Sequence, residues 1–253
     1  MSSVRYVAIG DSFTEGVGDE LPDGRIRGWA DIAAHGWANG IGEPIEYANL
    51  AIRGRLVWPI VDQQLEPALA LQPTHLSFNG GGNDMLRPKT DVERIADAFT
   101  HVLRRCDEEG VTLILLSGAN PSAQLPFGRV MQRRGDLLSA AVNDRMGDRT
   151  DVVRALNWAD RELGTPPFWS TDRLHMNTRG HHRVASRVLD ALGIDRPDEW
   201  WSLPEITESE RLRGAQYYRE HVGPWVRRRL AGTSSGDGRE PKFGSWVTFE
   251  PDD

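Results

Sequence analysis

The first residue with the type and place to do chemistry is a serine that follows an apolar segment. Ser12 lies in the sequence GDSFTEG, shortly after the run Arg5–Ile9. If that run is a strand, the Ser12 hydroxyl faces the crevice at the carboxyl end of a sheet, and its backbone N–H can meet an anion. A serine that only caps a helix has the same signature. The G-x-S-x-G elbow of lipases is absent because Thr14 stands at its last position.

An aspartate and a histidine three residues apart form the second candidate. Asp172 and His175 lie in DRLH, just before the suitable helix cap Asn177. On one loop, Asp172 can reach the Nδ1–H of His175, fix the tautomer and leave Nε2 free to take a proton from a serine. A surface pair without a catalytic role has the same pattern. No His, Cys and carboxylate set shows metal-ligand spacing, so we expect no metal. A serine that attacks with a histidine as its base needs no cofactor, so none is expected.

Two further segments could supply hydrogen-bond donors. Asn83 follows the glycines at 80–82 and can aim its amide N–H groups into the crevice, and Gly54 can offer an unhindered backbone N–H. A tight turn and an ordinary loop glycine are the alternatives. If all these segments meet at one edge of a sheet, they provide a nucleophile, a base with its orienting acid, and donors for an oxyanion, which together suit acyl transfer.

In these segments the sequence resembles the SGNH hydrolases, also called GDSL-type esterases and lipases. The resemblance extends from about residue 4 to residue 192. The four blocks follow the order of the family, and they read GDSFTEG at 10–16, NLAIRG at 49–54, GGND at 81–84 and DRLH at 172–175.

The resemblance implies a role for each matching residue. Ser12 would be the nucleophile, His175 the general base and acid, and Asp172 its partner. The oxyanion hole would consist of the backbone N–H groups of Ser12 and Gly54 and the side chain of Asn83. The expected activity is hydrolysis of carboxylic esters of a small molecule, lipid or acetylated sugar through an acyl-serine. An acyltransferase with the same chemistry and a non-catalytic binding module on the same fold are the alternatives.

Short apolar runs that alternate with helical segments must position these residues. Strands are expected at Arg5–Ile9, Ile45–Leu50, His75–Phe78, Val111–Leu116 and Asp151–Arg154. Helices are expected at Trp29–Trp37, at Ile60–Leu71, from a capping box at Thr90 to Gly110, and from Asn177 to Leu192. This order predicts a three-layer α/β/α sandwich with a mostly parallel five-stranded sheet, and the resemblance implies a flavodoxin-like arrangement.

The composition changes after residue 196. We expect an α/β domain at 1–196 and a C-terminal extension at 197–253, with a helix at Glu205–Val222, a polar link and an aromatic arm. The alternating segment Lys242–Phe249 predicts an edge strand or arm that packs on the domain or on a second subunit, which would make the protein a homo-oligomer. Trp169 either lines an acyl pocket or packs into the core. A loop is expected at 121–134.

Charge and composition limit the partners. The net charge of −7 argues against nucleic acid, and no apolar run is long enough for a transmembrane segment. The single cysteine, Cys106, excludes an internal disulfide framework. The start of the chain lacks the apolar stretch of a signal peptide, so we expect a cytoplasmic protein that acts on a small-molecule or acylated substrate.

Overall fold

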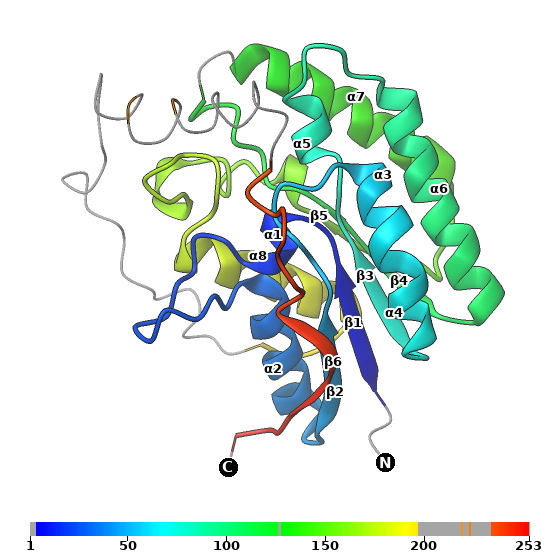
Figure 1. Ribbon diagram of the computed structural model, residues 1–253. Coiled ribbons are helices and arrows are strands. Elements are labelled where there is room, and N and C mark those ends of the chain that lie inside the picture. The colour runs from blue at the N-terminus through cyan, green and yellow to red at the C-terminus, as the bar shows by residue number, and fades with distance from the viewer. Residues whose placement is uncertain (1–3, 126–127, 197–218, 220–222, 224–233, 253) are drawn as a thin grey trace.

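The computed structural model describes residues 4–125, 128–196, 219, 223 and 234–252, and its centre is a six-stranded sheet. The strand order is β5-β4-β3-β1-β2-β6, and Figure 1 shows it from the β6 side. The strands are β1 (Arg5–Ile9), β2 (Ile45–Asn49), β3 (His75–Phe78), β4 (Thr112–Ser117), β5 (Val153–Leu156) and β6 (Phe243–Phe249). Strands β1 to β5 are parallel, and β6 pairs antiparallel with β2.

The predicted fold class is confirmed, and the predicted number of strands is wrong by one. The five expected strands all form, two of them with the predicted bounds, and β6 adds a sixth at the β2 edge. The alternating pattern of Lys242–Phe249 did not reveal which edge it would join, because backbone pairing with β2 spans some two hundred positions of the chain. The boundary at residue 196 and a homo-oligomer formed through the arm stay predictions.

Helices cover both faces of the sheet. On one face lie α2 (Trp29–Ile41) and α8 (Thr178–Leu192), and on the other lie the segments from α3 to α7 (Figure 1). These segments are α3 (Val57–Ile60), α4 (Glu66–Ala70), α5 (Gly82–Met85), α6 (Val92–Glu109) and α7 (Gly128–Met146), with a π-helical turn at Val61–Leu65. Since strand side chains alternate, Val7 and Ile9 of β1 face one helical layer while Tyr6 and Ala8 face the other.

Helix ends test the predicted capping signals. Asn177 caps α8, because its side chain accepts from the N–H of Gly180, and Gly193 ends the helix with a left-handed backbone, as predicted. The capping box at Thr90 is wrong by one residue. Asp91 caps α6 instead, while the Thr90 hydroxyl donates to the carbonyl oxygens of Asp84 and Arg87.

Two other predicted segments are the loop at 121–134 and the helix at Glu205–Val222. The segment 121–134 is not a loop throughout, because α7 already begins at Gly128. The predicted helix Glu205–Val222 lies outside the described residues, apart from residue 219. In the part of the chain that the structure describes, no helix has the length and apolarity to cross a membrane.

Candidate functional site

The predicted nucleophile is the first residue of a short helix at the carboxyl end of β1. Helix α1 (Ser12–Glu15) has only four residues, and Asp11 caps it by accepting a 3.1 Å hydrogen bond from the N–H of Phe13. The turn before α1 is fixed by a side chain from another part of the chain, Gln64. Gln64 accepts from the N–H of Gly10 at 2.9 Å and donates to its carbonyl oxygen at 3.0 Å. Ser12 therefore lies on a turn that Asp11 caps from within and that Gln64 of the π-helical turn holds in place.

The structure brings Ser12, His175 and Asp172 into one hydrogen-bonded series. The Nε2 atom of His175 lies 3.1 Å from the Oγ of Ser12, and its Nδ1 lies 2.5 Å from the Oδ2 of Asp172. The two residues of DRLH are thus close in space to the serine although 163 positions separate Ser12 from His175. With a proton on Nδ1, Nε2 is free to accept the serine proton.

The other oxygen of Asp172 is equally well satisfied. Its Oδ1 accepts from the Ser170 hydroxyl at 2.7 Å and from the backbone N–H groups of Leu174 and His175 at 2.9 and 3.0 Å. Burial alone would raise the pKa of Asp172, but the hydrogen bond and charge of His175 outweigh burial and hold that pKa well below its usual range. Asp172 is therefore ionised at neutral pH and oriented by four donors.

Asn83 follows β3 and is the second residue of the short helix α5. Its Nδ2 donates to the Oδ2 of Asp11 at 3.1 Å and to the carbonyl oxygen of Arg55 at 3.0 Å. The bond to Asp11 holds the amide close to the turn that carries Ser12, since Asp11 directly precedes Ser12. Asn83 and Ser12 line the same cavity.

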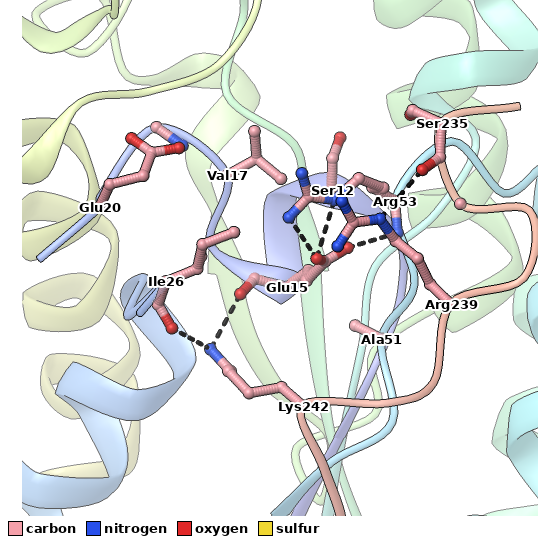
Figure 2. A network of polar contacts seen from close by, with 12 residues as sticks. Ser12, Glu15, Val17, Glu20, Ile26, Ala51, Arg53, Ser235, Arg239 and Lys242 are labelled. Carbon is pink, nitrogen blue, oxygen red and sulfur yellow. Dashed lines mark hydrogen bonds and ion pairs between the residues drawn. The ribbon is translucent and has the colours of Figure 1, made fainter. Parts of the chain in front are cut away.

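Gly54 lies on the loop after β2 and has a left-handed backbone, with φ of +76°. The preceding residue fixes this loop to α1: the Arg53 N–H donates to the Oε2 of Glu15 at 2.6 Å, and the Arg53 guanidinium pairs with Oε1 (Figure 2). Among the described residues, the backbone N–H groups of Ser12 and Gly54 donate to no other group. Gly54 is not one of the residues that line the cavity beside Ser12.

The cavity beside Ser12 has a volume of about 180 Å³ and a mostly apolar wall. Its wall comes from α5, α6, α7 and the segment after β5, and includes Met85, Leu86, Phe99, Leu138, Val142 and Trp158. Trp169 also contributes to the wall. It is 4% exposed, its indole N–H donates to the carbonyl oxygen of Leu163, and it packs in the core beside α8.

Sequence reasoning did not single out Asp11, Glu15, Arg53 or Ser170. Asp11 is buried, and burial raises its pKa to about 6 against the opposing effect of its hydrogen bonds. The signal for Glu15 and Arg53 was present, because opposite charges in two blocks that meet at one sheet edge can pair. In the described ranges, no three or more His, Cys, Asp or Glu side chains are grouped to hold a metal ion.

A mostly parallel sheet with helices on both faces places this chain in the class of α/β/α sandwiches. The chain belongs to the GDSL-like lipase/acylhydrolase family, whose sequence profile matches residues 8–183. The resemblance to the SGNH hydrolases, which the four blocks predict, is confirmed. Family membership supports a hydrolase that acts on esters. The sequence has no match among curated proteins.

Solved structures share the fold at low sequence identity. A psychrotrophic esterase, EstA from Pseudoalteromonas sp., is 16% identical with a TM-score of 0.59, over 76% of this chain and 97% of that one. The acetylxylan esterase Axe2 from Geobacillus stearothermophilus is 18% identical with a TM-score of 0.60, over 77% and 96%. TesA is 18% identical with a TM-score of 0.58, over 74% and 97%.

Proposed function

We propose that this protein is a serine esterase that cleaves carboxylic esters through an acyl-Ser12 intermediate. The observation that carries the proposal is the series from Ser12 Oγ to His175 Nε2, at 3.1 Å, and from His175 Nδ1 to Asp172, at 2.5 Å. Both distances are within hydrogen-bond range, as a nucleophile, its base and the acid that orients the base require.

In the first half of the reaction, the Oγ of Ser12 attacks the carbonyl carbon of the ester while His175 Nε2 takes the hydroxyl proton. The resulting imidazolium is stabilised by the ionised Asp172, which itself stays deprotonated. The tetrahedral oxyanion would receive hydrogen bonds from the backbone N–H groups of Ser12 and Gly54 and share one N–H of Asn83. His175 then protonates the alkoxide, and the alcohol leaves.

In the second half, water replaces the alcohol. His175 removes a proton from the water as its oxygen attacks the acyl carbon, and the same donors receive the new oxyanion. Collapse breaks the bond to Ser12, whose oxygen takes the proton back from His175, and the carboxylic acid is released. His175 passes the Ser12 proton to the alcohol and a water proton to Ser12, so the protons balance and the residues of this chain suffice for the proposed chemistry.

The apolar cavity supports an acyl group larger than acetyl as the acid part of the substrate. Met85, Leu138 and Trp158 offer a methylene chain contacts that water cannot match. Each methylene buried contributes about 0.8 kcal/mol, which corresponds to roughly fourfold in kcat/KM. We expect kcat/KM for p-nitrophenyl esters to rise from acetate to longer acyl chains and to fall once the cavity is full.

A variant pair tests the proposed activity. Ser12→Ala should lower kcat by about 10⁶ and abolish labelling by a fluorophosphonate probe, because the nucleophile is gone. Ser139→Ala is the matched control, since Ser139 lines the same cavity and has no part in the proposed chemistry. Unchanged turnover in Ser12→Ala, or labelling of that variant equal to wild type, would refute the proposal.

A further inference from the structure

The C-terminal arm, defined as residues 234–252, lies outside the region that the family profile matches. Its strand β6 runs antiparallel to β2, with Phe249 opposite Ile45 and Phe243 opposite Asn49. Because Asn49 is at the carboxyl end of β2, the residues just before β6 reach the edge of the sheet that carries Ser12. Figure 1 shows this segment passing beside α1.

A turn of the arm is in direct contact with the loop that carries Gly54. A Cβ atom on Gly54 would lie 2.2 Å from the Oγ of Ser234, and one on Gly236 would lie 2.0 Å from the carbonyl oxygen of Arg53. The turn is itself braced: Asp237 accepts from the N–H of Ser234 at 2.7 Å. The two backbones therefore pack together without room for a methyl group.

Lys242 fixes the arm to the nucleophile helix. Its side chain is 15% exposed, and its Nζ donates to the carbonyl oxygens of Glu15, Ile26 and Arg27 at 2.9, 3.2 and 2.5 Å. The same Nζ lies 2.8 Å from the Oδ2 of Asp31. Glu15 is the last residue of α1, so this contact reaches the helix that begins with Ser12.

The residue type at this position is unusual for this chain. Of its 30 basic residues, 28 are arginines, and the two lysines are Lys89 and Lys242. An ammonium is a compact charge with three donors, whereas a guanidinium is planar and its donors diverge. Four oxygen atoms that converge on one point, as they do at Lys242, fit the ammonium.

Glu15 connects Lys242 to the loop that carries Gly54. Its backbone accepts from Lys242, and its carboxylate accepts from the N–H and the guanidinium of Arg53 (Figure 2). Arg53 directly precedes Gly54, so the position of Glu15 determines where the Gly54 N–H lies. The loop is thus held by hydrogen bonds to Glu15 and by packing against the turn at 234–237.

We propose that the C-terminal arm positions the oxyanion hole, with Lys242 as the positioning residue that acts through Glu15 and Arg53 on the N–H of Gly54. This inference rests on the proposed esterase function. Oxyanion donors act on the transition state more than on bound substrate, so their displacement lowers kcat more than it raises KM. Complete loss of one donor costs about 10²–10³ in kcat, and a displaced donor costs part of that.

The test compares Lys242→Met with Lys89→Met, because Lys89 is the other lysine and is exposed. Turnover of a p-nitrophenyl ester and the rate of fluorophosphonate labelling are measured well below the melting temperature. For Lys242→Met we expect kcat and the labelling rate to fall by roughly 10- to 100-fold, with KM changed by less than about threefold. Lys89→Met should match wild type. Wild-type kcat in Lys242→Met would overturn the inference.

A double variant separates positioning from simple destabilisation. Lys242→Met leaves the Asp31 carboxylate buried without its cation, and adding Asp31→Asn removes that charge. We expect the double variant to recover melting temperature but not kcat, because the hydrogen bond from Lys242 to the Glu15 carbonyl oxygen is still missing. If kcat recovers together with the melting temperature, the arm has no positioning role. Loss of labelling in Ser12→Ala is a separate result, so a failure here leaves the esterase proposal standing.

Discussion

Replacing Asp172 by asparagine should inactivate the protein through the hydrogen bonds that the side chain already makes. The Oδ1 atom of Asp172 accepts from three donors, the Ser170 hydroxyl and the N–H groups of Leu174 and His175. An asparagine must keep its oxygen at that position, because an NH₂ group there would face three donors. The NH₂ group is then left facing the Nδ1 of His175.

An NH₂ group opposite Nδ1 reverses the tautomer of His175. Nδ1 must accept a hydrogen bond and the ring proton moves to Nε2, which faces Ser12 and can no longer take its proton. We expect kcat for a p-nitrophenyl ester to fall by about 10⁴, equivalent to about 5 kcal/mol in activation free energy. Ser170→Ala is the control, since it removes one donor and keeps the carboxylate, and should cost less than about tenfold in kcat.

Folding of the variant is checked through its pH dependence. Because the pKa of Asp172 is lowered in the folded state, its ionisation stabilises the fold above the unfolded pKa of about 4, and this contribution is lost as the pH falls through the folded value. Asp172→Asn should thus melt lower than wild type near neutral pH, and the difference should shrink in acid. A kcat within about tenfold of wild type in a folded Asp172→Asn would refute the tautomer argument.

Three further variants probe the surroundings of Ser12. Asn83→Ala should lower kcat by about 10²–10³ with little change in KM, as steady-state kinetics will show, because two backbone donors would remain. Wild type should lose stability in thermal melts as the pH rises from about 4 to 6, because burial raises the pKa of Asp11 to about 6 and its ionisation then costs stability, whereas Asp11→Asn cannot ionise there and should lack this pH dependence. Gly135→Ala would place a methyl group 1.9 Å from the Trp158 ring, so we expect about 1–3 kcal/mol of destabilisation in denaturant titrations and a shift in acyl-chain preference.

The sequence predicted the buried strands better than the elements at the surface. Arg5–Ile9 and His75–Phe78 form β1 and β3 with the predicted bounds, because each is buried after its first residue and a glycine follows within two residues of its end. The start of α7 at Gly128 was missed, since a glycine followed by several arginines carries no apolar stripe. Local pattern gave no partner for β6, whose register depends on a strand far away in the chain.

The candidate site could be predicted as a set of residues but not as a geometry. The motif blocks named Ser12, Asp172 and His175, and the structure places these within hydrogen-bond distance. Nothing local indicates that Lys242 reaches Glu15, which is 227 positions away, or that Asn83 is held by Asp11, 72 positions away. Such contacts follow from the strand order, which brings the carboxyl ends of β1, β2 and β3 together.

The edge of the sheet that carries Ser12 is held by partly buried ion pairs, whereas the core beneath it is held by apolar contacts. Each pair joins two segments of the edge: Arg53 with Glu15, Lys242 with Asp31, and Arg27 with Asp19. Burying such charges costs nearly as much as their attraction returns, so they contribute little net stability. Apolar contacts are non-directional, while charge-assisted hydrogen bonds fix both distance and angle. Because the site is assembled from separate loops, and an active site tolerates displacements of only about 0.5 Å, we infer that these pairs serve to position its donors.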